Sequence, residues 1–465
     1  MSNNNSQEQL KQIPAVDKIL NWSEIKEYLA KYRHSYISTI VRSKVDEFRQ
    51  QIISGVDIDV AGLKQNILDE LEFLTTRYFC HAINGLGVIL HTGLGRACFG
   101  QGIDVVAKEI AQGFSRLQID DEGKRDDRYR KISKLLQVIT GCEAGMIVNN
   151  NAGATLLVLS ALAKGKEVIV SRGQLIEIGG SFRLPEILAQ SGAILREVGT
   201  TNRTHLKDYK HAINDNTGLI LKVHQSNYRI LGFTKEVSLI ELVALGKKHN
   251  IPVVDDLGSG ALIDFSKYGL PKEPVVQESI QQGADLVCFS GDKLIGGPQC
   301  GVIIGKKIYI DKIKKHPLTR ALRCDKLTNA ILEATLQIFL LNEEEIIARH
   351  GVIGLMLKSV KEIKLQANQV AKALQKEFGA ILDISVVPVK SEIGGGSLST
   401  EELPSYAVAI KSTNLSIQGL AKKLRRYQPP IFGRITQDAL LLDFRTVLKG
   451  EEKIIINAFK EILTT

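Results

Sequence analysis

The sequence predicts an α/β fold in which a large domain with a mostly parallel sheet lies between a helical N-terminal domain and a small α+β C-terminal domain. Apolar residues before residue 75 recur at three- and four-residue spacing, and short β-rich runs alternate with amphipathic helices from about Ala144 to Gly305. A chain of 465 residues also exceeds the usual size of one domain. We therefore expect domains at residues 1–75, 76–328 and 329–465.

The N-terminal domain is expected to be helical. The stretches KILNWSEIKEYLAKYR and ISTIVRSKVDEFRQQIISG have helical spacing, and Gly55 is a plausible stop. No catalytic motif occurs there. The segment either packs on the rest of the chain or presents helices to a partner.

The large domain is expected to contain a parallel sheet covered by helices on both faces. Its predicted strands are MIVNN, EVIVS, AILREV, GLILKVH, IPVVDD and ADLVCFS, with helix candidates such as Ala154–Ala163 and Val237–Asn250 between them. Ligands of such sheets bind beyond the carboxyl ends of the strands. The small domain is predicted from a long helix around Leu355–Phe378, the strand runs DISVVPV, SYAVAIKS, PPIFGRI and ALLLDFRTV, and a final helix over Glu451–Leu463.

Composition narrows the class of protein. No apolar run approaches the roughly 18 residues of a membrane span, and the first residues lack the plan of a signal peptide, so we expect a cytoplasmic protein without membrane association. Neither the six cysteines nor the nine histidines show metal-binding spacing, so no metal site is indicated. The net charge of +9 favours anionic partners such as nucleic acid or phosphate, although solubility alone also explains it.

Two strand ends carry residues suited to a phosphorylated ligand. In VNNNAGAT, Val148–Thr155, small residues lead into a helix whose first N–H groups can bind phosphate, although Asn and Gly also make ordinary turns. In PVVDDLGSG, an acid at the strand end can hold a protonated ring nitrogen. Alternatively, Asp255 and Asp256 cap the next turn.

A third strand end, SGDK, carries Lys293. A lysine that a strand delivers into a cleft can lose its proton by desolvation and form a Schiff base, whereas most lysines are simply solvated. Ser290, the phosphate-type turn and the strand-end acid favour the first interpretation, because pyridoxal phosphate needs an amine, an acid and phosphate donors. The combination predicts a fold of the aspartate aminotransferase type, with the active site at a dimer interface.

The chain resembles bacterial selenocysteine synthase, the L-seryl-tRNA(Sec) selenium transferase family, over nearly its whole length. The resembling stretches include IPAVDKILNW, INGLGVILHTGLGRA, REVGTTNRTHLKDY, KVHQSNYRILGFT, SGDKLIGGPQCG, LTRALRCDKLT and IGGGSLSTEELPSYA. The resemblance implies that Lys293 holds the cofactor, that Asp292 assists catalysis and that Asp256 pairs with the pyridine nitrogen. The other implied cofactor-binding residues are Ser290, Asn150, Asn151, Ala152 and Gly153 for the phosphate, and His224, Ser226 and Asn227 for the wall.

The resemblance also implies the reaction and its partners. Seryl-tRNA(Sec) would lose its β-hydroxyl, with Asp292 as a possible general acid, and selenium from selenophosphate would add to the dehydroalanyl intermediate. Arg96, Arg320 and Arg323 would bind selenophosphate, since a guanidinium binds such an anion through two parallel hydrogen bonds. If LTRALR is helical, Arg320 and Arg323 share a helix face. The family further implies a homodimer unit, assembled into a ring of ten subunits.

Departures from the family pattern leave alternatives open. GKRDDRY, Gly123–Tyr129, has Asp126 and Asp127 where the family usually has small residues, and these acids would weaken anion binding if they faced the site. The main alternative is a paralogous pyridoxal-phosphate enzyme acting on a small phosphorylated amino acid or amino sugar, and a second is a binding module without catalysis. The N-terminal domain would grip tRNA, or the basic run AKKLRRYQ would, unless that run is a solvated helix face. The segment Val170–Gly180 is expected to contribute to the wall beside the ring.

Overall fold

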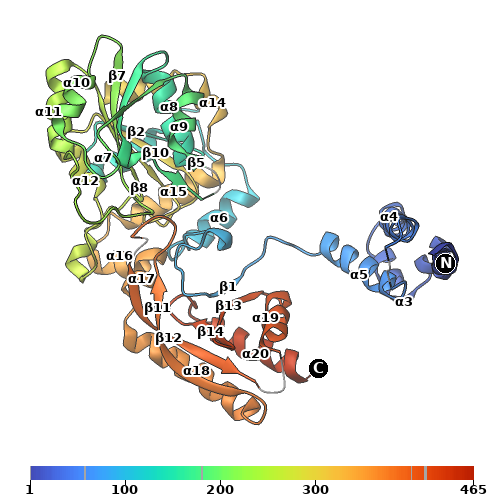
Figure 1. The fold of residues 1–465 in the computed structure, drawn as a ribbon. Coiled ribbons are helices and arrows are strands. Elements are labelled where there is room, and N and C mark those ends of the chain that lie inside the picture. Colours follow the sequence, from blue (N-terminus) through green and yellow to red (C-terminus); the bar gives the residue numbers. More distant parts are fainter. Residues whose placement is uncertain (1, 57–58, 180–181, 399–400, 413–415, 465) are drawn as a thin grey trace. The chain divides into compact units, whose positions relative to one another are not determined.

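The computed structural model describes residues 2–56, 59–179, 182–398, 401–412 and 416–464. The chain forms two compact units, Met1–His81 and Ala82–Thr465, and each is built from its own helices or its own helices and strands (Figure 1). Among the described residues, no helix combines the length and the apolar composition that crossing a membrane requires.

The N-terminal unit is built from helices, as predicted. They are α1 (Ser2–Gln12), α2 (Val16–Leu20), α3 (Ser23–Leu29), α4 (His34–Ile53) and α5 (Gly62–Thr75). Their apolar stripes meet in a core that includes Ile25, Val41 and Ile67, each essentially buried. Gly55, just after α4, has φ +82°, the left-handed conformation that commonly ends a helix.

The second unit contains the predicted large sheet, with strand order β2-β10-β9-β8-β7-β3-β6. Its strands are β2 (Ala144–Val148), β3 (Glu167–Ser171), β6 (Ile194–Val198), β7 (Thr217–Val223), β8 (Val253–Gly258), β9 (Leu286–Ser290) and β10 (Gly301–Gly305). Strands β9, β8, β7, β3 and β6 run parallel, whereas β10 runs antiparallel to both β2 and β9. The mostly parallel sheet is therefore confirmed.

Helices cover this sheet on two sides. Helix α8 (Asn151–Leu162) packs against β2, β9 and β10, and α11 (Leu239–His249) packs against β7 and β8 (Figure 1). Every residue of β2, β9 and β10 is buried, which explains their continuous apolar runs. The unit's other helical and strand elements are η1 (Thr92–Leu94), α6 (Ile103–Gln112), α7 (Arg130–Thr140), η2 (Arg172–Gln174), β4 (Glu177–Ile178), β5 (Phe182–Arg183), α9 (Leu184–Ser191), α10 (Leu206–Ala212), η3 (Phe265–Tyr268), α12 (Val276–Gln281), α13 (Lys307–Lys314), α14 (Leu318–Ala321), α15 (Lys326–Ile338), α16 (Glu343–Arg349) and α17 (Gly351–Leu357).

A smaller sheet has the order β1-β13-β14-β12-β11. Its elements are β1 (Ile83–Gly85), β11 (Asp383–Glu392), β12 (Glu402–Lys411), β13 (Ile431–Thr436) and β14 (Ala439–Asp443), with helices α18 (Val360–Phe378), α19 (Ile417–Arg426) and α20 (Glu451–Thr464). The predicted α+β character is confirmed. Strand β1 pairs with β13, so Ile83–Gly85 joins this sheet although the sequence places it in the large domain. The three-domain division itself stays a prediction.

A third apolar cluster of the second unit joins segments that are distant in sequence. Leu90, Leu294, Val352, Ile393 and Leu398 are all buried in it. Leu294 follows the candidate lysine directly, and Ile393 precedes a run of three glycines. The cluster therefore brings the glycine run next to the strand end that carries Lys293.

Candidate active site

Lys293 lies in a cavity of about 170 Å³ at the carboxyl end of β9. It is only 4% exposed, and Ser290 and Asp256 line the same cavity. A tight turn follows, in which Gly296 N–H donates to the Lys293 carbonyl at 2.9 Å. At Gly291, a Cβ would lie 2.3 Å from Cys300 Sγ, so the glycine lets the backbone pass closely into β10.

Asp256 is the strand-end acid that faces the cavity. Its Oδ1 accepts from Asn151 Nδ2 at 2.8 Å, and its Oδ2 accepts from Thr155 Oγ1 at 2.9 Å. Burial raises the pKa of Asp256, opposed by these hydrogen bonds and by the charge of Lys293. Asp255 points to the other face of β8, where it accepts from Ser279 Oγ at 2.7 Å. Strand alternation thus separates two acids that the sequence leaves equivalent.

The N-terminus of α8 opens on the cavity through Asn150, Asn151 and Ala152. Asn150 caps the helix, because its side-chain oxygen accepts from Gly153 N–H at 2.8 Å. The cap uses the Gly153 N–H, and Gly153 does not line the cavity. The groups of this turn that face a ligand therefore belong to the first helical residues.

Arg96 and Asp292 form an ion pair beside Lys293. Arg96 Nη1 lies 2.9 Å from Asp292 Oδ2, and Asp292 is buried. Burial lowers the pKa of Lys293, and the charge of Arg96 lowers it further, while Asp292 and Asp256 act in the opposite direction. The site therefore makes the neutral amine, the form that reacts with an aldehyde, easier to form at Lys293 than at a solvated lysine.

The predicted wall residues follow β7. His224 and Ser226 line the cavity, whereas Asn227 is exposed and donates from Nδ2 to the Glu177 carbonyl at 2.8 Å. The His224 ring lies 3.4 Å from Glu273 Oε1, a buried carboxylate that the sequence analysis did not single out. Ile176, Ile178 and Gly179 also line the cavity, within the segment predicted to contribute to the wall.

The two remaining predicted arginines lie outside this cavity. Helix α14 ends at Ala321, so Arg320 and Arg323 do not share a helix face, and both are exposed. Their segment nevertheless touches the α8 turn, since the Leu322 carbonyl accepts from Asn149 N–H at 2.9 Å. Of the three predicted arginines, only Arg96 lines the cavity around Lys293.

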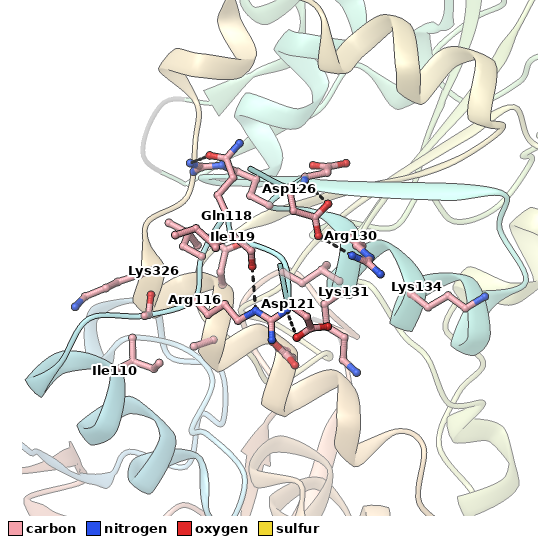
Figure 2. A pocket seen from close by; sticks show the side chains of 18 residues that line it. Ile110, Arg116, Gln118, Ile119, Asp121, Asp126, Arg130, Lys131, Lys134 and Lys326 are labelled. Carbon is pink, nitrogen blue, oxygen red and sulfur yellow. Dashed lines mark hydrogen bonds and ion pairs between the residues drawn. The ribbon is translucent and has the colours of Figure 1, made fainter. Parts of the chain in front are cut away.

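The segment Gly123–Tyr129 lies at a different cavity of about 710 Å³. Figure 2 shows Asp126 paired with Arg130 there, at 2.8 Å. Asp127 pairs with Lys314 at 2.7 Å. Both departures from the family pattern are thus balanced by cations and do not line the cavity of Lys293.

Gln299, Gly258 and Val223 also line the cavity and escaped the sequence analysis. Gln299 stands six residues after Lys293 in GGPQCG, where proximity to the lysine was the only available signal. In the part of the chain that the structure describes, no three His, Cys, Asp or Glu side chains are grouped to hold a metal ion.

Comparison with known proteins identifies the chain's relatives. The family model for L-seryl-tRNA selenium transferase matches residues 82–448, and that for the selenocysteine synthase N terminal matches residues 10–49. The L-seryl-tRNA(Sec) selenium transferase of Alkaliphilus oremlandii is 44% identical over 461 residues, covering 97% of this chain and 98% of that protein. That of Carboxydothermus hydrogenoformans is 46% identical over 450 residues, covering 95% of both.

Among solved structures, D-glucosaminate-6-phosphate ammonia-lyase matches with a TM-score of 0.56 and 19% identity, covering 86% of this chain and 98% of that one. This similarity shows a shared fold. The sequence relatives span the chain almost from end to end, and the family model covers well over half of it. The chain therefore belongs to the L-seryl-tRNA selenium transferase family.

Proposed function

We propose that this chain converts L-seryl-tRNA(Sec) to L-selenocysteinyl-tRNA(Sec), with pyridoxal phosphate as its cofactor and selenophosphate as its selenium donor. One observation carries the proposal. The buried Lys293 and the buried Asp256 line one cavity in a chain that is 44% identical, nearly end to end, to a transferase of this name.

The residues of the cavity suit pyridoxal phosphate. Lys293 is a buried amine with a lowered pKa, as Schiff-base formation requires. Asp256 is a buried carboxylate fixed by two side chains, suited to a protonated ring nitrogen. The first N–H groups of α8, with Ser290 at the end of β9, supply donors for a phosphate. The Asn151 side chain is committed to Asp256, so only its backbone N–H would be left to contact the phosphate.

When bound, the cofactor supplies an electron sink that stabilises charge at the seryl α-carbon. Lys293, the amine that lines the cavity, would then serve as the base that accepts the proton of that carbon. Asp292 holds Arg96 at the cavity, where the guanidinium can orient an anion. We assign Asp292 a positioning role through Arg96, with proton donation to the leaving hydroxyl as the alternative.

Selenophosphate, with Arg320 and Arg323 as its further ligands, remains part of the proposal. Both side chains are exposed and lie beyond the cavity of the single chain. We propose that they act in a homo-oligomer built from dimers, with a ring of ten as the expected assembly. Largely exposed apolar side chains in the second unit, such as Phe114, Leu231 and Phe233, support burial of this surface by further subunits. A charged tRNA as substrate also favours the cytoplasm as the compartment.

The alternative, action on a small phosphorylated amino acid or amino sugar, has less support. The ammonia-lyase that acts on such a sugar shares the fold at 19% identity, whereas the selenium transferases share more than 40%. No feature of the cavity favours the sugar.

The test is conversion of serine to selenocysteine on charged tRNA(Sec), with selenophosphate and the cofactor-loaded protein. We expect conversion by the unaltered chain and none by Lys293→Ala, which also loses the visible absorption band of the bound cofactor. Lys449→Ala, at an exposed lysine outside the cavity, is the control and should match the unaltered chain. A Lys293→Ala protein that retains full conversion would disprove the assignment.

A further inference from the structure

A turn made of three glycines reaches Lys293 from the small-sheet side of the chain. Gly394, Gly395 and Gly396 have φ of +75°, +63° and +70°, and Ser397 N–H donates to the Gly394 carbonyl at 3.2 Å. Positive φ at both central residues is what a type I′ turn requires, and glycine adopts it without strain. The turn lies between β11 and β12 and was not part of the predicted site.

The turn is held close to the reacting amine. A Cβ built on Gly396 would lie 3.6 Å from Lys293 Nζ and 3.4 Å from Ser226 Oγ. On the opposite side, Leu90 N–H donates to the Ile393 carbonyl at 2.7 Å, and a Cβ on Gly395 would lie 2.9 Å from Leu90 Cβ. The turn therefore packs against Leu90 and brings Gly396 close to Lys293, at the edge of the cavity whose lining does not include the three glycines.

Hydrogen-bonding groups remain available where the turn and the lysine meet. Within the described residues, the N–H groups of Gly394, Gly395 and Gly396 donate no hydrogen bond, and all three glycines are partly exposed. Lys293 is 96% buried and lines the cavity, and among those same residues its amine has neither a hydrogen bond nor an ion pair. Polar groups left unpaired in a partly buried site require a ligand or water. The unpaired N–H groups and the unpaired amine are independent observations, and they lie close together because a Cβ on Gly396 would be 3.6 Å from Lys293 Nζ.

The charges around this space favour a neutral acceptor. Arg96 is engaged by Asp292 at 2.9 Å, and Asp256 adds a second carboxylate. Arg445, a buried cation of the small-sheet region, is committed to the carbonyls of Leu355, Met356, Lys358 and Pro404. The carboxylate of a free amino acid would have to share Arg96 with Asp292 and with selenophosphate, the anion assigned to that guanidinium above. An aminoacyl ester brings a neutral carbonyl oxygen, which backbone N–H groups satisfy.

We propose that the backbone N–H groups of Gly394–Gly396 bind the ester carbonyl of the aminoacyl substrate, so that the turn selects an aminoacyl ester over the free amino acid. The inference rests on the proposed function, because it assumes that an amino group is brought to Lys293.

The experiment uses the full chain loaded with pyridoxal phosphate and two small probes, L-serine methyl ester and L-serine. Binding is monitored through the change in the visible absorption of the cofactor. The half-saturating concentration of each probe is calculated for the form whose amine is unprotonated. We expect at least tenfold tighter half-saturation for the ester. Equal half-saturation for the two probes overturns the proposal.

The variant Gly396→Ala tests the location. Its methyl group and the strained φ displace the turn, so we expect the ester preference to fall to threefold or less. The matched control is Gly450→Ala, at φ +98° with open space around its Cβ position, which should keep the full preference. Gly396→Asn, which tolerates this φ better, is the second variant and should also lose the preference. Retention of the full preference in both variants overturns the assignment to the turn.

These outcomes are separate from the test of the proposed function. A chain that prefers the ester but converts no seryl-tRNA(Sec) refutes the selenium transferase assignment and leaves the turn's role intact. A chain that converts seryl-tRNA(Sec) but binds both probes equally refutes the role of the turn alone.

Discussion

Lys293 owes its expected reactivity to neighbours that the sequence places far away. Burial is the main cause of its lowered pKa, and Arg96, almost two hundred residues earlier, is the next. Asp292 raises the pKa of Lys293 and at the same time holds Arg96 in place. Removal of either partner of the ion pair is therefore expected to change the pKa of Lys293.

Arg96→Gln is expected to shift the pH dependence of cofactor uptake upward. Loss of the guanidinium raises the pKa of Lys293, and the unpaired Asp292 raises it further, so less neutral amine is present at a given pH. We expect uptake by the apoprotein to be roughly threefold to tenfold slower at pH 7.5, measured as growth of the visible band. Arg130→Gln, in the pair with Asp126, is the control. An unchanged or downward-shifted profile for Arg96→Gln would contradict this account.

A second prediction at the scale of single residues concerns the two acids of GKRDDRY. Asp126 and Asp127 pair with Arg130 and Lys314 and do not line the cavity of Lys293. Replacing them by Asp126→Gly and Asp127→Ser should change the cofactor's Kd less than twofold and lower the free energy of unfolding only slightly, because exposed ion pairs contribute little to stability. Spectral titration and urea unfolding measure the two quantities. A Kd that improves tenfold would show that the acids do act on the site.

At the scale of elements, the loop after Lys293 is tied to helix α17. His350 precedes this helix and is buried, with Nε2 donating to the Ile295 carbonyl at 2.7 Å and Nδ1 accepting from Ile353 N–H at 3.1 Å. A Cβ on Gly296 would lie 2.3 Å from the His350 ring. One neutral imidazole thus caps a helix and holds the backbone next to the lysine.

This arrangement predicts a loss of stability in acid. Burial lowers the pKa of His350 to about 4 from 6.5, so the unfolded chain binds the proton more tightly. Stability from this group is complete above pH 6.5 and falls as the pH drops towards 4, with about 2 kcal/mol lost between pH 7.5 and pH 5. We expect His350→Asn to be less stable at pH 7.5 and to lack this slope. Urea unfolding at both pH values gives the comparison, and parallel slopes for the two proteins would refute it.

Periodicity was enough to predict most strands and helices, because β9 is a nearly continuous apolar run and the buried apolar residues of α11 recur at helical spacing. It could not predict β1, which has three residues and is specified by pairing with β13, nor the approach of Gly394–Gly396 to Lys293. At the site, Lys293, Asp256 and Asn151 were found because each lies at or just beyond the carboxyl end of a strand. Glu273 and Gln299 were missed because their positions depend on contacts between distant segments.

At the scale of the whole molecule, we expect tRNA recognition and chemistry to belong to different units of the chain. The unit Met1–His81 has a helical core of its own and contains none of the residues that line the cavity of Lys293. Its match to a separate family model agrees with this division. A tRNA exceeds any ligand that a cavity of about 170 Å³ can enclose, so most of its contacts must lie elsewhere on the protein.

Removal of residues 1–81 is therefore expected to separate the two activities. The remaining residues 82–465 retain both sheets and the cavity, so they should keep the visible band of the bound cofactor and the preference for L-serine methyl ester. Conversion of charged tRNA(Sec) should fall at least a hundredfold, because the N-terminal unit no longer holds the tRNA, a loss equivalent to about 2.7 kcal/mol of binding. Conversion is measured with the truncated and the full chain at equal cofactor occupancy, and the oligomeric state of both is measured by light scattering. Undiminished conversion by residues 82–465 would move tRNA recognition to the second unit, where the basic face of α19 would be the next surface to test.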